Sequence, residues 1–217
     1  MQAKTLDHVA FWVQDREPLV DYATRHLGMH VIDKQEAFTL IGSDARRGKL
    51  TLFSAEGPRE RGAIKHVALR VATLPAGRDD PVELGEGIEV KLVEAQTDVD
   101  YDLDHVALFS RAPREAAAEY TRFGFAPAED SPDGHPRVEA GGAYVEFHPG
   151  DPRDPERPLL NHVAVLVDSA DEQKEEAEAM GIVERFVDAA NTRAVFVWGP
   201  DRVRIEYVEH KPTFSLQ

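Results

Sequence analysis

The stretch Leu160-Asn161-His162-Val163-Ala164-Val165-Leu166-Val167 determines the architecture of this chain, because its pattern occurs four times. Each copy reads apolar, polar, His, Val, Ala and then a largely apolar run. The copies are short and rich in β-branched and aromatic residues, which is typical of strands. Four copies of one strand indicate an internally repeated fold. The other three copies begin at Leu6, Ile64 and Leu103.

Side chains alternate along a strand, so the His and Ala of each copy share one face and the Val lies on the other. The Val face is apolar enough to pack against a helix. The His face carries small residues, which leave room beside the imidazole. A single such His is usually part of a core, but packing alone would accept Leu or Val at all four positions. The repeated His8, His66, His105 and His162 therefore indicate a chemical role.

The composition excludes several classes of function. A chain of 217 residues suffices for one sizeable domain or two small ones. Its net charge of −15 argues against nucleic acid and anionic membranes as partners. The absence of cysteine excludes disulfides, thiolate metal sites and a Cys nucleophile. No apolar run approaches the roughly 20 residues of a membrane span, and no signal peptide is recognisable. A soluble, cytoplasmic protein is expected.

The segments after each His strand predict modules of the type β-α-β-β-β. In the first module a helix is expected over residues 18–27, followed by strands at 29–34, 38–42 and 49–54. The four histidines are 58, 39 and 57 residues apart, so the second module lacks about one helix. Residues 74–87, rich in Pro, Gly and Asp, are expected to form a loop or one helical turn. Helices are predicted near residues 114–123 and 171–180 in the last two modules.

The expected fold class is therefore α+β. Four βαβββ-type modules, the second degenerate, are predicted to form two pseudo-repeated halves with curled mixed β-sheets around a cavity. The boundary between the halves is expected at residues 98–102, which are rich in Asp. This divides the chain into an N-terminal pair of modules, residues 1–97, and a C-terminal pair, residues 102–217.

Two glutamates occupy apolar strands at similar distances from a module's first His. Glu146 follows His105 by 41 residues, and Glu206 follows His162 by 44. Burying a carboxylate is costly unless it is paired or binds a metal, and imidazole with carboxylate suits a divalent transition metal. In the first module the position 44 residues after the first His is Leu52. The N-terminal pair is therefore expected to be metal-free, and the C-terminal pair to carry the metal site.

At this point the chain resembles the vicinal oxygen chelate superfamily, which includes glyoxalase I, extradiol ring-cleaving dioxygenases, methylmalonyl-CoA epimerase and the fosfomycin and bleomycin resistance proteins. The resemblance rests on the four modules, the His near the start of each, and the Gly-Pro-Asp and Ile-Glu motifs at the end of the last one, residues 199–201 and 205–206. It implies a divalent metal, with Fe(II) favoured and Mn, Ni or Zn as alternatives. It also implies a small substrate with neighbouring oxygens, and it leaves a homodimer open.

The resemblance implies two alternative ligand sets. Extradiol dioxygenases with four modules would use His105, His162 and Glu206, which leaves coordination positions open. Glyoxalase- and epimerase-type enzymes would add Glu146 as a fourth ligand. The dioxygenase interpretation is preferred, because the layout of four modules with the site in the C-terminal pair is a larger feature of the sequence than the ligand pattern that includes Glu146. A non-enzymatic, drug-binding resistance protein is the third alternative. His148, Tyr144 and His210 are candidate acid–base residues, because they share strand faces with the glutamates.

Overall fold

A computed structural model of the chain describes residues 1–43, 48–74 and 81–212. All four copies of the repeated stretch form strands, as predicted. They are β1 (Thr5–Val13), β5 (Ile64–Val71), β8 (Asp102–Ser110) and β12 (Leu160–Leu166). The α+β class is confirmed: the chain is mostly β-sheet with few helices, arranged as two mixed sheets that are not closed. No helix in the described part of the chain is long and apolar enough to cross a membrane.

The first module has the predicted order of elements. After β1 come α1 (Arg16–His26), β2 (His30–Lys34), β3 (Phe38–Gly42) and β4 (Lys49–Ser54). The helix begins after Asp15, whose side chain accepts a hydrogen bond from the backbone N–H of Glu17. It ends just before Gly28, which takes up the left-handed conformation at φ 72°.

The second module is shorter. It contains β5, β6 (Val82–Gly85) and β7 (Ile88–Glu94). The predicted loop or helical turn at 74–87 lies partly outside the described residues, because 75–80 are not described. Strand β6 occupies part of the remainder. Between His66 and Ile88, no helix occurs in the residues that the structure describes.

The third and fourth modules again contain a helix each. The third has β8, α2 (Pro113–Tyr120), a 3₁₀ turn (Thr121–Phe123), β9 (Ala126–Pro127), β10 (Arg137–Ala140) and β11 (Ala143–Pro149). The fourth has β12, α3 (Ala170–Met180), β13 (Val183–Asp188), β14 (Thr192–Trp198), a 3₁₀ turn (Pro200–Arg202) and β15 (Arg204–His210). Each predicted helix is thus present, with ends that differ by a few residues.

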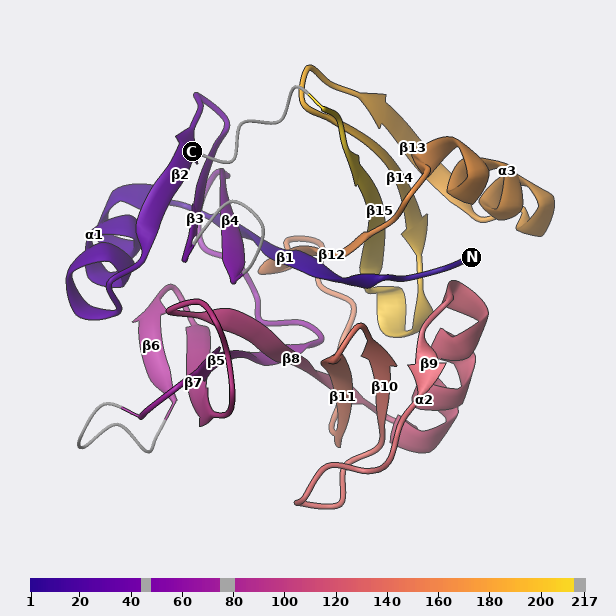
Figure 1. Ribbon diagram of the computed structural model, residues 1–217, viewed down its shortest axis with the longest axis horizontal. Coiled ribbons are helices and arrows are strands. Elements are labelled where there is room, and N and C mark those ends of the chain that lie inside the picture. The colour runs from indigo at the N-terminus through magenta and orange to yellow at the C-terminus, as the bar shows by residue number, and fades with distance from the viewer. Residues whose placement is uncertain (44–47, 75–80, 213–217) are drawn as a thin grey trace.

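The sheets do not follow the predicted division into residues 1–97 and 102–217. One sheet has the order β13-β14-β15-β12-β1-β4-β3-β2 and so joins the fourth module to the first. The other has the order β6-β7-β5-β8-β11-β10-β9 and joins the second to the third. Figure 1 shows the first sheet in its upper half and the second in its lower half. The sequence could not reveal this pairing, because all four first strands carry the same pattern.

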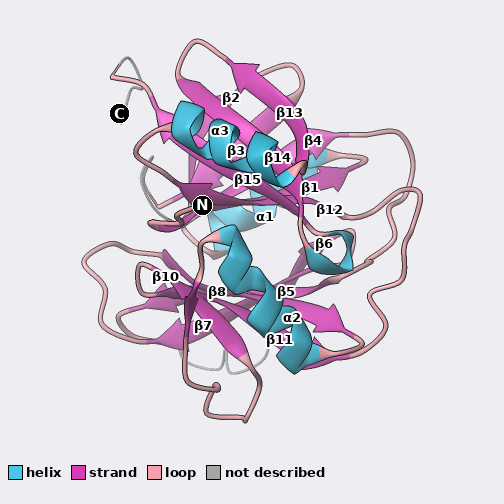
Figure 2. Cartoon of the chain, turned by 90° about the vertical axis from the view of Figure 1, so that its right-hand side faces the viewer, coloured by secondary structure: helices cyan, strands magenta, loops and turns pink. Residues whose placement is uncertain are grey.

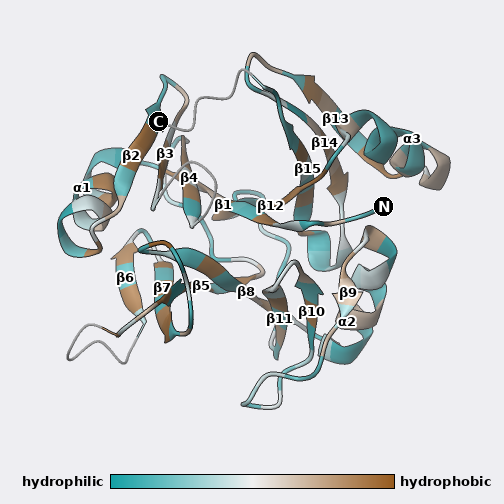
Figure 3. Ribbon diagram, in the orientation of Figure 1, coloured by the Kyte–Doolittle hydropathy of each residue, from teal (hydrophilic) through white to brown (hydrophobic). Residues whose placement is uncertain are grey.

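The core lies between the two sheets and under the helices. Val9, Val67, Val106 and Val163, the valines that follow the four histidines, all belong to one cluster of buried apolar residues. Figure 2 shows the two sheets one above the other, and in Figure 3 the ribbons of α1 and α3 carry both hydrophilic and hydrophobic residues. The Val faces therefore form the shared core, and the opposite, His-bearing faces remain available for a site.

Candidate metal centre

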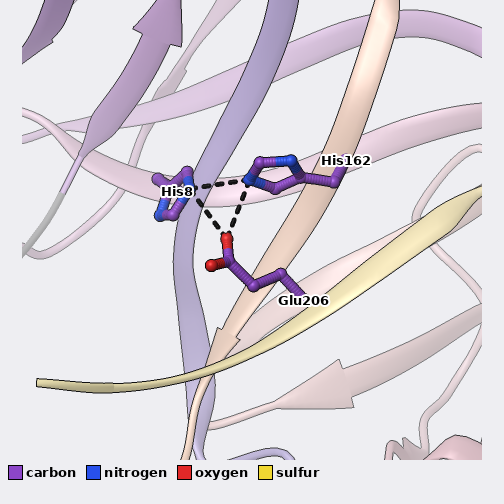
Figure 4. Close-up of side chains that lie close together, drawn as sticks. All are labelled: His8, His162 and Glu206. Atoms are coloured by element: carbon purple, nitrogen blue, oxygen red, sulfur yellow. Dashed lines mark hydrogen bonds and ion pairs between the residues drawn. The ribbon is translucent and has the colours of Figure 1, made fainter. Parts of the chain in front are cut away.

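Three side chains from three neighbouring strands meet on the His face of the eight-stranded sheet. They are His8 on β1, His162 on β12 and Glu206 on β15 (Figure 4). The Nε2 atoms of His8 and His162 lie 3.0 Å apart. Glu206 Oε2 lies 2.8 Å from His162 Nε2 and 3.3 Å from His8 Nε2. In the described part of the chain, this is the one group of three such donors that could hold a metal ion.

The repeated sequence pattern explains why the two imidazoles can meet. Strands β1 and β12 are antiparallel, with His8 opposite Ala164 and Ala10 opposite His162. Each imidazole therefore faces a methyl group across the strand pair, and the two rings approach each other over the small side chains. On the far side of β12, Glu206 is paired with Ala164, which places its carboxylate on the same face.

The outer nitrogens of both imidazoles are held by oxygen atoms. His8 Nδ1 lies 2.7 Å from Asp7 Oδ1, and His162 Nδ1 lies 2.9 Å from Asn161 Oδ1. Arg204 also donates to this oxygen of Asn161. Contacts of this kind to Nδ1 turn Nε2 of each ring inward, which is the usual orientation of metal-binding histidines. A β-bulge in β1 between Leu6 and His8 lets the side chain of the neighbouring Asp7 reach the imidazole of His8.

This donor set fits a divalent metal. Two imidazole nitrogens and a carboxylate oxygen face one another at 2.8–3.3 Å, and a positive charge placed between them would interact favourably with all three. Ligands about 2.0–2.2 Å from one ion are themselves roughly 3 Å apart when they subtend a right angle. The separations of 2.8 and 3.0 Å agree with that value, and the third, 3.3 Å, is slightly longer. His8, His162 and Glu206 would therefore hold the ion.

The charges around the site favour a cation. Burial lowers the pKa of His8, but hydrogen bonds to Asp7 and Glu206 outweigh burial and raise it to about 9. Burial raises the pKa of Glu206, but the charges of His162 and His8 outweigh burial and lower it below its usual range. Burial lowers the pKa of His162, against the opposing effect of Glu206. Glu206 is thus an ionised carboxylate in a buried setting.

A second layer of charges supports Asp7. Its carboxylate accepts a hydrogen bond from Lys49 Nζ at 2.8–2.9 Å and lies 3.0 Å from His210 Nε2. Asp7 and Lys49 are 2% and 1% exposed. Burial raises the pKa of Asp7, but Lys49 and the two imidazoles outweigh it and hold it well below its usual value. The ring of His8 is therefore fixed by an anion that is itself compensated.

The three donors open into a cavity of about 360 Å³. Its walls are largely aromatic and aliphatic, with Trp12, Phe38, Phe53 and Phe196 among them. The rings of Phe53 and Phe196 lie edge-on to His162, at centroid distances of 6.2 and 5.4 Å. A cavity of this size suits a small molecule, and most of its wall would exclude water.

The counterpart of Glu206 in the first module is Thr51, and not Leu52 as the spacing predicted. Thr51 on β4 pairs with Ala10, as Glu206 on β15 pairs with Ala164. Thr51 lines the cavity, whereas Leu52 is fully buried in the core. The prediction was wrong by one residue, and one residue along a strand reverses the face.

A second cluster occupies the same position in the seven-stranded sheet. We call His66, His105, Glu146 and His148 the second cluster. His66 Nε2 and His105 Nε2 lie 3.0 Å apart, as in the first site. Glu146 has the register of Glu206, but its carboxylate accepts a hydrogen bond from His148 Nε2 at 2.7 Å. Lys65 Nζ donates to the other nitrogen of His148 at 2.8 Å.

Positive charge already surrounds the second cluster. Lys91 pairs with Ala68 and thus takes the position that Thr51 has in the first sheet. Burial and the charges of His105 and the two lysines lower the pKa of His66 to about 3. Burial raises the pKa of Glu146, but the bond from His148 and neighbouring imidazoles outweigh it and lower it to about 2. Lys65 and Lys91 beside the neutral His66 disfavour a cation.

The structure therefore does not bring together the four predicted metal ligands. His162 and Glu206 lie in one sheet, and His105 and Glu146 in the other. The sequence argument missed His8 as the partner of His162, and it also missed Asp7 and Asn161. The sequence signal that could have revealed Asp7 and Asn161 is the polar residue that precedes each repeated His. One of the three candidate donors, His8, belongs to the N-terminal pair, which the sequence argument expected to be metal-free.

The three predicted acid–base residues are also divided between the sheets. His210 lines the cavity of the first site beside Asp7. His148 belongs to the second cluster, where its ring lies 3.8 Å from that of His135. Tyr144 is on the same strand as His148, under the guanidinium of Arg137 at 4.0 Å. Only His210 remains near the candidate metal centre.

Comparisons with known proteins agree with this fold. Residues 5–76 match the family model described as the Glyoxalase/Bleomycin resistance protein/Dioxygenase superfamily. No curated protein matches the chain by sequence. The resemblance to this superfamily inferred from the sequence is confirmed.

Solved structures match over nearly the whole chain. One is described as a putative dioxygenase from Bacillus subtilis, with 13% identity, a TM-score of 0.76, and coverage of 97% of this chain and 86% of that one. Another is a V278E mutant of glyoxalase I from Zea mays, with 17% identity, a TM-score of 0.71, and coverage of 94% and 92%. At these identities the likeness shows a shared fold, and the site must indicate the function.

Proposed function

We propose that this protein is a metal-dependent enzyme that acts on a small substrate with neighbouring oxygens, most like an extradiol ring-cleaving dioxygenase. The observation that carries the proposal is the convergence of His8, His162 and Glu206 with Thr51 at the fourth position. Two His and one carboxylate with open coordination positions are typical of non-haem iron(II) oxygenases. Iron(II) is therefore the favoured metal, with Mn, Ni or Zn as alternatives.

The proposed ligands replace the set expected from the sequence. His8 takes the place of His105, and Glu146 is left out. A glyoxalase- or epimerase-type site would need a fourth ligand, a second Glu or a Gln, and the register supplies Thr51 there instead. A drug-binding protein without metal would have no need of a buried carboxylate facing two imidazoles.

The surrounding residues have defined tasks in this proposal. When bound, the metal would polarise two neighbouring substrate oxygens, and iron would add the redox chemistry that dioxygen requires. Asp7 and Asn161 hold the two imidazoles in the binding orientation. Phe53 and Phe196 exclude water beside His162. His210, held by Asp7 at the cavity wall, is positioned to exchange a proton with a substrate hydroxyl.

The test is anaerobic reconstitution with iron(II), followed by measurement of catechol-dependent oxygen consumption and iron content. His8→Gln should lose both iron and activity. His66→Gln is the matched control, because His66 holds the equivalent position in the other sheet, and it should retain both. Oxygen consumption that survives His8→Gln, or that disappears only in His66→Gln, would place the site elsewhere. Stoichiometric iron without any catechol-dependent turnover would reject the dioxygenase reading.

A further inference from the structure

A row of side chains runs across the eight-stranded sheet from the metal centre to its outer edge. The register pairs Glu206 on β15 with Phe196 on β14, and Phe196 with Arg185 on β13. Directly opposite residues point to the same face of a sheet. With strands about 4.8 Å apart, the backbone of Arg185 lies roughly 10 Å from that of Glu206. All three side chains line the cavity.

The space between Glu206 and Arg185 is shaped for a flat apolar group. Phe196 forms its floor in the row, and Phe53 stands on the other side of His162. The next row on the same strands consists of Val187, Ala194 and Val208, which are all apolar. A planar ring with two neighbouring oxygens at the metal ligands would therefore extend past Phe196, whose ring also carries the guanidinium of Arg204, toward Arg185.

Arg185 differs from the other arginine of the cavity. Arg204 donates to Glu184 through Nε and Nη2, at 2.5 and 3.0 Å, and its guanidinium lies 4.2 Å from the centroid of Phe196. It is thus held in place as part of the wall. Arg185 is exposed and, among the residues that the structure describes, it has no hydrogen-bond or ion-pair partner. A guanidinium of this kind presents its fork to whatever enters the cavity.

We propose that Arg185 is a specificity-determining residue that binds an anionic group at the far end of the substrate. The substrate class is then an aromatic vicinal diol with a carboxylate on the side of the ring opposite the two oxygens. This inference rests on the proposed function, because it places the diol at His8, His162 and Glu206. The distance across the row matches one aromatic ring plus the reach of an arginine side chain.

The charge of the cavity supports an anionic substrate. Of the two buried carboxylates, Asp7 is compensated by Lys49, and Glu206 would be compensated by a bound cation. Glu184 compensates Arg204. The charge of Arg185 and the second charge of a divalent ion are then left over, and together they favour a ligand with more than one negative charge.

The test measures binding and needs no turnover. The full-length protein is loaded with zinc, and dissociation constants are measured by calorimetry for catechol, 3,4-dihydroxybenzoate and 2,3-dihydroxybenzoate. Wild-type protein should bind 3,4-dihydroxybenzoate about ten-fold more tightly than catechol, as for one charge-assisted hydrogen-bonded pair. The 2,3-isomer carries the same charge beside the diol, where Arg185 is out of reach, and it should gain nothing.

Two variants separate Arg185 from general charge effects. Arg185→Gln should bind 3,4-dihydroxybenzoate and catechol equally well. Arg202→Gln is the matched control: it removes one positive charge from an adjoining cavity, where Arg202 is paired with Asp154, and it should keep the ten-fold preference.

The outcomes separate this inference from the proposed function. Suppose that catechol and 3,4-dihydroxybenzoate bind only with metal present. If Arg185→Gln then keeps the preference for 3,4-dihydroxybenzoate, or if 2,3-dihydroxybenzoate shares that preference, the role of Arg185 is refuted and the metal site stands. If neither catechol nor 3,4-dihydroxybenzoate binds to the zinc-loaded protein, or if zinc itself does not bind, the proposed function is refuted together with the inference.

Discussion

Replacing Glu206 with Gln should abolish most of the stabilisation that a metal gives to the fold. The change keeps the size of the side chain and removes the only anionic ligand of the site, which is 7% exposed and 2.8 Å from His162. Loss of a supporting residue beyond the ligands typically costs 10–100-fold in metal affinity. Loss of the carboxylate ligand itself should therefore cost about 100-fold or more.

This loss translates into a thermal shift. At a zinc concentration 100 times the dissociation constant of the wild-type protein, binding stabilises the fold by about 2.7 kcal/mol. For a chain of this length that is a rise in Tm of about 5–10 °C. With affinity reduced 100-fold, the same concentration gives about 0.4 kcal/mol and a rise of about 1–2 °C. Calorimetric scans with and without zinc would measure both shifts.

Glu146→Gln is the matched control for this experiment. Glu146 has the same register in the other sheet, but its carboxylate is bound to His148. Its zinc-dependent shift should equal that of the wild-type protein. Zinc binding to the unfolded chain affects both variants alike, because both retain all nine histidines. A full shift in Glu206→Gln, or a shift lost in Glu146→Gln, would refute the assignment of the site.

Three further predictions concern the residues around the two clusters. Thr51→Glu should supply a fourth protein ligand. In titrations, zinc should then bind more tightly and catechol more weakly, each by roughly ten-fold. Unchanged catechol binding would contradict a metal site with open coordination positions. His66 has a pKa of about 3 in the fold, below the ordinary value of 6.5, so the unfolded chain takes up its proton first and stability falls as the pH drops from 6.5 toward 3. The slope is about 1.4 kcal/mol per pH unit at most, and urea unfolding at several pH values should show a shallower slope for His66→Gln; an equal slope would count against a neutral His66. Lys49→Met should destabilise the fold by about 3–5 kcal/mol because it removes one partner of a buried pair. The double variant with Asp7→Asn should lose less than the sum of the single losses, and simple additivity in chemical denaturation would argue against coupling.

The sequence was sufficient for the fold because the information is local and repeated. The pattern around His162 specifies a strand with one apolar and one His-bearing face, and four copies specify four modules. The ends of the helices are likewise determined by local residues, such as Asp15 and Gly28 at the two ends of α1. The resemblance to the superfamily followed from these features, and so did the expectation that His162 and Glu206 share a site.

Only the tertiary structure decided which modules share a sheet. The four first strands are nearly interchangeable in sequence, so nothing local distinguishes the pairing of β1 with β12 from the pairing of β8 with β12. That choice depends on how all the strands and helices bury their apolar faces together. It brought His8 to His162, separated Glu146 from Glu206, and divided His210 from His148 and Tyr144.

The register between strands was equally beyond the sequence. Counting 44 residues from His8 leads to Leu52, but the strand pairing places Thr51 on the cavity face and Leu52 in the core. A difference of one residue in the preceding loops is invisible in sequence spacing, yet it inverts the face of every residue that follows. The sequence thus determined which chemical groups are present, and the packing of the sheets decided which of them meet.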